Sequence, residues 1–271
     1  MEKIFIRSEN AEYQIIRSLK QNRVKRRKYG EIFIEGIESI KQAINAEIKF
    51  TRIITCNLNQ LSDWADNLIK SNNNTKVIEM TAALYKNLCD REDPSEIVVT
   101  AKVNHLNLQD IELPQKPFIL IFDRPSDCGN FGSIVRSANS FKVDALFVAG
   151  HAIDIYDPKV IRSSLGSIFH SKIINIPSMD ELKKWIDTQK QMKKMVIAGS
   201  DSTGCISLQN HKLEKPIALI LGNEAKGMSL SLKSMCDYIV SIPISGEVNS
   251  LNVACAGSIL LWEIYRNSDA I

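Results

Sequence analysis

The second half of the chain alternates between short apolar segments and helical segments, and this alternation limits the fold more than any other feature. The apolar, strand-like segments span residues 118–123, 145–149, 172–176, 195–199, 217–221 and 238–244. Helical patterns lie between or after them, at residues 132–141, 158–169, 179–191, 229–235 and 252–266. Apolar strands separated by helices predict βα units, and therefore a parallel sheet with helices on both faces.

The first half also mixes strands and helices, but with less regularity. Strands are expected at 31–35, 52–56, 76–80 and 97–103, and helices at 10–20, 36–46, 61–69 and 82–88. The segment 111–117 contains two prolines, which remove backbone donors and disfavour helix. We therefore expect an α/β protein with a smaller N-terminal domain over residues 1–112 and a second domain over residues 117–271.

Composition narrows the class of protein. Hydrophobic residues make up 44% and charged residues 24%, which is typical of a folded globular chain and not of a disordered one or a coiled coil. The longest apolar run, at 118–122, is far shorter than the ~18 residues of a membrane helix, and the first residues lack the pattern of a signal peptide. We therefore expect a cytoplasmic protein with free cysteines. The cysteines and histidines show no zinc-binding spacing, so no metal is expected.

Several common catalytic motifs are missing. No G-x-G-x-x-G follows a strand, and there is no P-loop, no H-E-x-x-H and no G-x-S-x-G. This argues against a dinucleotide enzyme, a P-loop NTPase, a zinc protease and a serine hydrolase. The aspartates near strand ends are interpreted mainly as turn and cap residues; they are Asp123, Asp127, Asp154 and Asp157.

A cluster of basic residues lies between Lys20 and Lys28. The net charge of +3 says little about partners, but Lys25, Arg26, Arg27 and Lys28 are consecutive. Such a cluster can bind phosphates and release counterions. A solvated helix end is the alternative interpretation.

Three polar segments follow strands of the second half. The first contains Asn130 and Arg136, and the second places Glu224 between two glycines. The third begins with Ile242 and Pro243 and runs through a polar loop to Ser250. Ligands of parallel sheets bind at the carboxyl ends of the strands. Taken singly, however, each segment could be an ordinary helix cap or βα turn.

Taken together, the three segments resemble a known family. Residues 130–138 fit N-x-G-x-x-x-R-x-A, residues 222–227 fit G-x-E-x-x-G, and residues 242–253 fit I-P-x-x-G-x-x-x-S-L-N-V. In this order they resemble the motifs of the SpoU (TrmH) branch of the SPOUT superfamily, which are RNA ribose 2′-O-methyltransferases using S-adenosylmethionine. The resemblance covers residues 117–271. More loosely, residues 25–46 resemble the start of the family's appended RNA-binding domain.

The resemblance implies a fold and a cofactor site. Family members fold the catalytic domain as a parallel sheet whose C-terminal segment forms a deep trefoil knot, and S-adenosylmethionine binds in the knotted loops. The residues that carry over as cofactor-binding are Leu221, Gly222, Ile242, Pro243 and Leu251. We expect Gly222 to let the backbone approach the ligand, and Ile242 and Leu251 to contact adenine.

The resemblance also implies the catalytic residues, with Arg136 and Asn130 as the principal pair. A guanidinium stays protonated in proteins. We therefore expect Arg136 to bind the adjacent phosphate and stabilise the developing alkoxide, while a phosphate oxygen or water takes the proton. Arg136 as the base is the alternative. Glu224, Ser250 and Asn252 carry over as residues that order the loops and contact RNA or cofactor, and Glu224 could equally be a structural anchor.

The expected partners are RNA and a second copy of the chain. Lys25, Arg26, Arg27 and Lys28 are the candidate RNA-binding residues, and the extra N-terminal domain favours ribosomal RNA over tRNA. A tRNA methyltransferase, a catalytically silent RNA-binding relative and a base methyltransferase are the alternatives. Family members are usually homodimers, and the apolar last helix fits either a dimer interface or burial against its own sheet.

Overall fold

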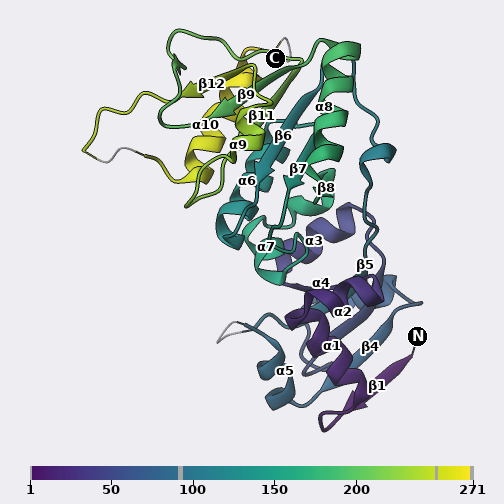
Figure 1. Ribbon diagram of the computed structural model, residues 1–271. Helices are drawn as coiled ribbons and strands as arrows, with labels where there is room; N and C mark the ends of the chain where they lie inside the picture. The colour runs from purple at the N-terminus through teal and green to yellow at the C-terminus, as the bar shows by residue number, and fades with distance from the viewer. Residues whose placement is uncertain (1, 91–93, 248–249, 269–271) are drawn as a thin grey trace. The chain divides into compact units, whose positions relative to one another are not determined.

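The computed structural model describes residues 2–90, 94–247 and 250–268, and the chain forms two compact units (Figure 1). The first unit comprises Met1–Asn104 and Asp154–Phe169, and the second comprises His105–Ile153 and His170–Ile271. The sequence placed residues 154–169 in the second domain, whereas the structure packs them with the N-terminal unit. It also ends the first stretch of that unit at Asn104, before the two prolines.

The first unit is built on a five-stranded mixed sheet with the order β1-β4-β3-β5-β2. Its strands are β1 (Lys3–Ile6), β2 (Glu31–Glu35), β3 (Phe50–Thr55), β4 (Lys76–Met80) and β5 (Ile97–Lys102). β4 pairs in parallel with β1 and β3, and β5 pairs antiparallel with β2 and β3.

Helices complete the first unit. They are α1 (Ala11–Gln21), α2 (Arg23–Tyr29), α3 (Ile37–Asn45), α4 (Asp63–Ser71), α5 (Ala82–Leu88) and α7 (Pro158–Ser163), followed by the 3₁₀ helix η2 (Ser167–His170). The apolar face of α1, with Tyr13, Ile16 and Leu19, packs on Phe33 and Ile54 of the sheet. Burial of this face holds α1 in place, since each buried side chain of this size contributes about 1.5–3 kcal/mol.

The second unit contains a seven-stranded sheet with the order β10-β12-β9-β11-β6-β7-β8. Its strands are β6 (Phe118–Asp123), β7 (Ala145–Ala149), β8 (Ile173–Ile176), β9 (Val196–Ser200), β10 (Ile206–Ser207), β11 (Ile217–Leu221) and β12 (Tyr238–Ser241). Every neighbouring pair is parallel. The parallel sheet expected from the alternation of apolar and helical segments is therefore confirmed.

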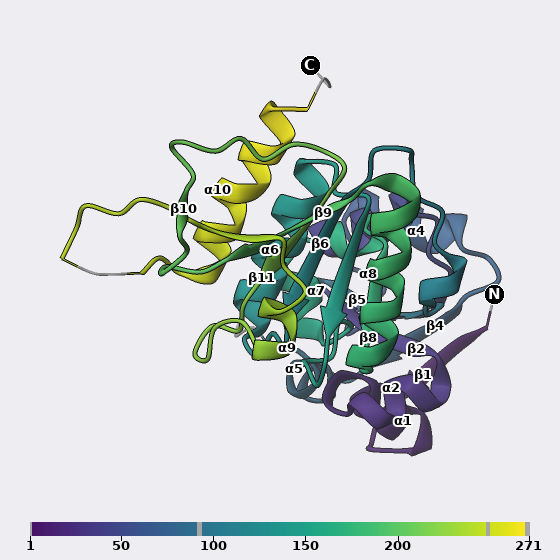
Figure 2. The same cartoon turned by 45° about the horizontal axis from the view of Figure 1, so that its top comes forward.

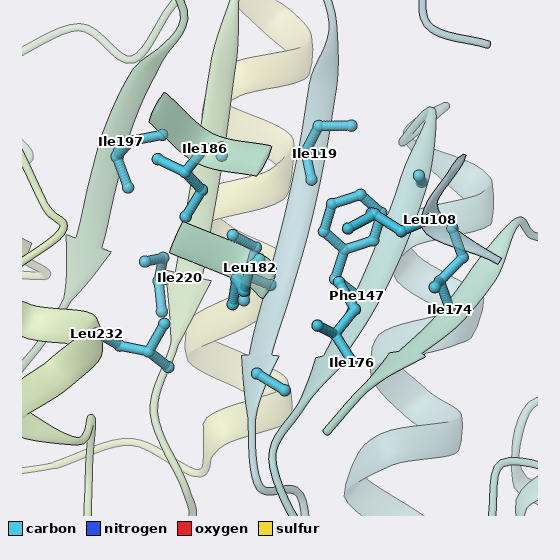
Figure 3. Packing of buried hydrophobic residues seen from close by; sticks show 14 of the residues in the cluster. Leu108, Ile119, Phe147, Ile174, Ile176, Leu182, Ile186, Ile197, Ile220 and Leu232 are labelled. Atoms are coloured by element: carbon cyan, nitrogen blue, oxygen red, sulfur yellow. The ribbon is translucent and has the colours of Figure 1, made fainter. Parts of the chain in front are cut away.

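Helices cover both faces of this sheet. They are α6 (Cys128–Ser140), α8 (Met179–Lys193), α9 (Leu230–Lys233) and α10 (Val253–Arg266), with the short 3₁₀ helix η1 (Leu108–Asp110). α6 and α10 lie side by side on the face opposite to α8 (Figure 2). On the α8 face, Leu182 and Ile186 pack against Ile119, Phe147 and Ile220 of the strands (Figure 3).

The packing of α10 depends on a glycine. A Cβ atom at Gly257 would overlap the side chain of Ile134 in α6 and lie 2.8 Å from Cδ1 of Leu221 in β11. α10 therefore lies in direct contact with α6 and with the end of β11. This brings the beginning of α10 close to the loops that follow the central strands.

Most predicted elements are present, with shifted ends. α6 begins at Cys128, four residues before the predicted start, because the side chain of Asp127 caps the helix by accepting from the backbone N of Asn130 at 2.7 Å. The helix predicted at 158–169 ends at Ser163, since Leu165 and Gly166 adopt positive φ angles of 50° and 80°. The trefoil knot stays a prediction.

None of the helices in the described part of the chain is long and apolar enough to cross a bilayer.

Candidate functional site

A cavity of about 200 Å³ lies beyond the carboxyl ends of β9, β11 and β12. Four stretches of the second unit line it: Ser200, Asp201 and Ser202; Leu221, Gly222, Asn223, Glu224 and Gly227; Ile242 and Ile244; and Ser250, Leu251, Val253 and Ala256. One part of the wall is apolar, and the segment after β9 is polar. Such a lining suits a flat apolar ring that carries polar substituents.

The cavity brings together most of the residues expected to bind a cofactor. Leu221, Gly222, Ile242 and Leu251 all line it, together with two of the expected catalytic residues, Glu224 and Ser250. Pro243 is exposed and is not part of the lining. Positions 248 and 249 of the third motif lie outside the described residues.

The packing of the loop itself requires glycine at position 222, independently of any contact with a ligand. A Cβ atom at this position would overlap the backbone N of Met228 and lie 2.6 Å from the carbonyl carbon of Gly227. The loop between them is closed by two hydrogen bonds between the backbones of Asn223 and Gly227, at 3.0 and 2.9 Å. The second motif therefore forms a tight loop at the carboxyl end of β11.

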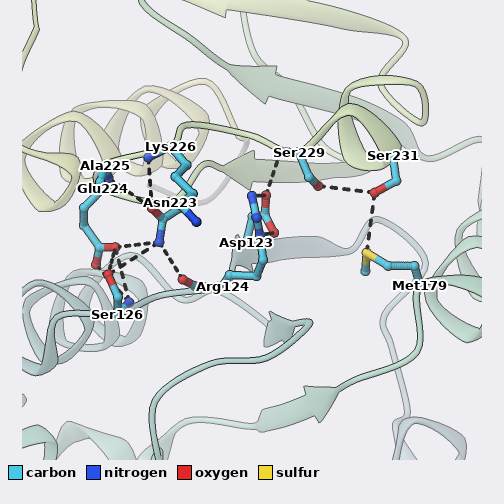
Figure 4. A network of polar contacts seen from close by, with 10 residues as sticks. All are labelled: Asp123, Arg124, Ser126, Met179, Asn223, Glu224, Ala225, Lys226, Ser229 and Ser231. Carbon is cyan, nitrogen blue, oxygen red and sulfur yellow. Dashed lines mark hydrogen bonds and ion pairs between the residues drawn. The ribbon is translucent and has the colours of Figure 1, made fainter.

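Glu224 joins this loop to the segment before α6 (Figure 4). Its carboxylate accepts hydrogen bonds from the backbone N of Ser126 and Asp127, and from Oγ of Ser126 at 2.8 Å. Nδ2 of Asn223 donates to the same carboxylate at 3.2 Å and to the carbonyl oxygen of Arg124 at 2.7 Å. These contacts support the interpretation of Glu224 as an anchor between two loops.

Asn130 and Asn252 connect the first and third motifs. Nδ2 of Asn252 donates to Oδ1 of Asn130 at 2.9 Å. Oδ1 of Asn252 caps α10 by accepting from the backbone N of Ala254 at 2.8 Å. Asn130 is therefore held at two points, its backbone N by Asp127 and its side-chain Oδ1 by Asn252.

Arg136 lies about one and two-thirds helical turns after Asn130, on the exposed side of α6. No acidic side chain of the described residues forms an ion pair with its guanidinium, so the cation is available to a ligand. Its neighbour Ser137 donates to or accepts from Ser258 of α10 at 2.7 Å. The helix that presents Arg136 is thus held against the helix that follows the third motif.

The sequence reasoning missed the polar segment after β9. Asp201 pairs with Nζ of Lys233 at 2.7 Å and accepts from N and Oγ1 of Thr203 at 3.0 and 2.8 Å. The bond from Lys233 holds the pKa of the Asp201 carboxyl below its ordinary value. The signal was present, since Ser200 ends a strand at the same edge of the sheet as the three motifs.

The basic cluster divides into buried and exposed cations. Arg26 has only 4% of its surface exposed and pairs with Asp154 at 2.7 Å and Asp157 at 3.3 Å. It cannot present its charge to a phosphate backbone, which corrects its place among the RNA-binding residues. Lys25 is half-buried, whereas Arg27 and Lys28 are exposed on α2.

Asp154 and Asp157 take part in capping as well as in this pairing. Asp157 caps α7 by accepting from the backbone N of Lys159 at 3.0 Å. Asp154 accepts from the backbone N of Tyr156 at 3.3 Å, as in a turn. Among the described residues, no cluster of three His, Cys, Asp or Glu side chains could hold a metal ion.

Comparison with known families matches both halves of the chain. Residues 117–262 match the SpoU rRNA Methylase family, and residues 10–99 match the SpoU L30e-like domain.

Individual relatives match along nearly the whole length. A 23S rRNA (uridine(2479)-2′-O)-methyltransferase of Streptomyces viridochromogenes is 35% identical, covering 96% of this chain and 91% of that protein. The crystal structure of the SpoU methyltransferase AviRb from the same organism, in complex with AdoMet, has a TM-score of 0.88 at 34% identity and covers 95% and 98% of the two chains. A structure described as an RNA 2′-O ribose methyltransferase has a TM-score of 0.81 at 25% identity, with 97% and 98% covered.

Proposed function

Because the chain belongs to the SpoU rRNA methylase family, we propose that it transfers a methyl group from S-adenosylmethionine to a ribose 2′-hydroxyl of ribosomal RNA. The observation that carries the proposal is the meeting of three distant segments at one site. Asn130 of the first is hydrogen-bonded to Asn252 of the third, and both the second and the third line one cavity. The full-length similarity to a 23S rRNA 2′-O-methyltransferase supports ribosomal RNA as the substrate.

The cavity fits the nucleoside part of the cofactor. Leu221, Ile242 and Leu251 offer apolar surface for adenine, and the tight loop at Gly222 offers backbone groups for its polar edge. When bound, S-adenosylmethionine supplies an electrophilic methyl group on a sulfonium. The task of the protein is then to place the acceptor oxygen in line with that methyl carbon, so positioning provides much of the rate.

Arg136 is the residue to which we assign the main electrostatic role. The 2′-hydroxyl must lose its proton as it attacks, and a guanidinium beside it stabilises the developing negative charge. The same group can hold the neighbouring phosphate of the RNA through two parallel hydrogen bonds. Since a guanidinium remains protonated, the proton passes to a phosphate oxygen or to water. Asn130, fixed by Asp127 and Asn252, helps to orient the acceptor.

The N-terminal unit supplies RNA affinity in this proposal. Lys25, Arg27 and Lys28 lie on one short helix, and none of them pairs with an acidic side chain of the described residues. Arg26 contributes indirectly, because its buried ion pairs fix the helix that carries the three cations. Binding through such cations depends on salt and not on base sequence.

We also propose that the protein acts as a homodimer in the cytoplasm. α10 leaves Cys255, Ile259, Trp262 and Arg266 on one exposed stripe, with 40% of Ile259 and 47% of Trp262 accessible. Trp262 packs against Phe141 and Tyr265 in tilted arrangements, at centroid distances of 5.7 and 5.9 Å, which extends the apolar surface onto the end of α6. A second copy covering this stripe would lie beside the helix that carries Arg136.

The test is methyl transfer to defined RNA. Purified protein is incubated with S-adenosylmethionine carrying a radioactive methyl group and with 23S rRNA, 16S rRNA or tRNA from cells that lack the gene. The modified ribose is then mapped by alkaline hydrolysis, because a 2′-O-methyl group blocks cleavage at that nucleotide. We expect one protected position in 23S rRNA.

The other outcomes decide between the alternatives. Protection in tRNA alone would replace the ribosomal substrate with tRNA. RNA binding without incorporation of label would favour a catalytically silent relative. Incorporated label without protection from alkali would indicate a modified base and would contradict the proposed reaction.

A further inference from the structure

Two carboxylates line the described part of the cavity, and they differ in what they can still bind. A carboxylate offers about four acceptor positions on its two oxygens. The positions on Glu224 are filled by donors from Ser126, Asp127 and Asn223. Glu224 therefore has no capacity left for a ligand.

Asp201 is different. Its Oδ1 accepts from N and Oγ1 of Thr203, whereas Oδ2 contacts only Nζ of Lys233 among the described residues. About one acceptor position on Oδ2 therefore remains open. The side chain is held by these partners rather than free to rotate, and Asp201 is one of the residues that line the cavity.

The partner of that open position is a neutral donor rather than a cation. Lys233 lies 2.7 Å from Oδ2 and already balances the charge of the carboxylate. A second cation at the same oxygen, such as the ammonium group of a methionine moiety, would meet repulsion from Lys233. A hydroxyl meets no such repulsion, and the hydroxyls of Ser200 and Ser202 beside Asp201 offer partners to a second one.

We propose that Asp201 accepts a hydrogen bond from a ribose hydroxyl of the cofactor and makes the site selective for nucleosides that carry an intact ribose. The proposal rests on the proposed function, since it assigns a subsite within the same cavity. The apolar residues Leu221, Ile242 and Leu251 then contact adenine, and the polar segment after β9 binds the sugar. Lys233 balances the charge of the carboxylate, while Thr203 orients it.

The test is a competition assay on the purified full chain. Labelled S-adenosylhomocysteine occupies the site, and adenosine or 2′,3′-dideoxyadenosine displaces it. We expect the unmodified protein to bind adenosine about tenfold more tightly than the dideoxy nucleoside, because the dideoxy nucleoside loses a hydrogen bond to a charged acceptor. Asp201→Asn should reduce this preference to about twofold or less, since its amide can still accept from Thr203 but presents NH₂ where Oδ2 stood.

A control variant separates recognition of the sugar from collapse of the loop. Lys233→Met breaks the ion pair but keeps the carboxylate, so the preference for adenosine should persist. A loop that merely collapses in Asp201→Asn would weaken both nucleosides and keep their ratio, which would overturn the inference. A protein that binds S-adenosylhomocysteine but does not discriminate the two nucleosides, or is not displaced by adenosine, would also overturn it.

The proposed function is checked separately in the same assay. Absence of S-adenosylhomocysteine binding to the unmodified protein would contradict the proposed cofactor, and the assignment of Asp201 with it. If Asp201→Asn weakens S-adenosylhomocysteine but leaves the adenosine preference intact, the carboxylate contacts the amino-acid part instead. That result would overturn the sugar assignment and leave the proposed function standing.

Discussion

Glu224 and Arg136 are both polar residues of the candidate site, but they differ in whether other residues already bind their charged groups. The carboxylate of Glu224 accepts hydrogen bonds from the segment before α6 and thereby joins two loops (Figure 4). Arg136 lies exposed on α6, and its guanidinium forms no ion pair with the described residues. This difference is why we propose that Glu224 shapes the binding site and that Arg136 stabilises a developing charge.

The first prediction concerns Arg136. Arg136→Ala should lower the rate of methyl transfer by about 10²–10³, the range typical for removing a donor that stabilises an oxyanion. Binding of S-adenosylhomocysteine should stay within about twofold, because Arg136 does not line the cavity. Single-turnover kinetics and a binding isotherm measure the two effects. Near-normal transfer in this variant would contradict the role assigned to the guanidinium.

The second prediction concerns pH. The bond from Lys233 lowers the pKa of Asp201 from its ordinary value of 3.8, so the ionised carboxyl stabilises the folded state. A lowered folded pKa adds stability that is present above pH 3.8 and is lost as the pH falls through the folded value. Lys233→Met should therefore reduce stability by up to about 1 kcal/mol at pH 7, with the difference shrinking below pH 4. Urea unfolding at several pH values tests this, and a difference that grows on acidification would contradict it.

At the scale of elements, the helix α2 is held in place by Arg26. The basic residues around Arg26 in the sequence had suggested that it is exposed. Arg26 lies among five other cations between Lys20 and Lys28, yet its guanidinium also donates to the carbonyl oxygens of Leu19 and Lys20, at 2.8 and 2.9 Å. Its carboxylate partners lie more than a hundred residues later in the chain. No local pattern reveals such a pair, which is why the sequence assigned Arg26 to RNA.

The third prediction follows from this burial. Arg26→Met should destabilise the first unit by about 3 kcal/mol, because removing one partner leaves Asp154 and Asp157 without their cation. Lys25→Met is the matched control on the same helix and should change stability by no more than about 0.5 kcal/mol. Urea unfolding followed through Trp64, which belongs to this unit, measures both. Equal effects of the two variants would show that the buried ion pairs of Arg26 add nothing to the stability of the first unit.

The fourth prediction concerns the exposed cations of α2. Arg27→Glu combined with Lys28→Glu should weaken RNA binding and make it less dependent on salt, since fewer counterions are released. The slope of log affinity against log salt should fall by about two for two lost phosphate contacts. Charge reversal at Lys183 and Lys184 of α8 provides a control with the same change in net charge. An unchanged slope would show that Arg27 and Lys28 do not contact RNA and form only a solvated helix face.

The elements that the sequence predicted well are those whose side chains face a core. The strands of the second unit are continuous apolar runs, and β6, β7 and β11 begin and end at the predicted residues. Two short strands, β1 and β10, and the basic helix α2 were not predicted. Each has few buried apolar residues, so its formation depends on pairing with distant segments or on Arg26, and neither leaves a periodic signal.

At the scale of the whole molecule, the sequence predicted loops that line one cavity but not how the chain divides into its two units. The three motifs stand at strand ends of one parallel sheet, and topology then brings those ends to one edge. Residues 154–169 also follow a strand of that sheet, but they pack within the N-terminal unit through contacts such as Ser39 with Ile161. Contacts of this kind, between segments far apart in the chain, have no counterpart in composition or spacing.

The last prediction concerns assembly. If the exposed stripe of α10 joins two copies, Trp262→Glu should convert a dimer into a monomer, because the buried aromatic residue becomes a charge without a partner. Met192→Glu is the control, since Met192 is exposed on α8, which covers the opposite face of the sheet. Sedimentation at micromolar concentrations distinguishes the two states.

Thiol labelling gives an independent reading of the same interface. Burial raises the pKa of Cys89 to about 12 and that of Cys236 to about 11, so both should react slowly at pH 8. Cys205 and Cys255 are exposed in the single chain and should react quickly. Cys255 lies on the α10 stripe, so the dimer should protect it while Cys205 stays reactive, and Trp262→Glu should remove that protection. Equal labelling of Cys205 and Cys255 at concentrations where the protein sediments as a dimer would place the interface elsewhere.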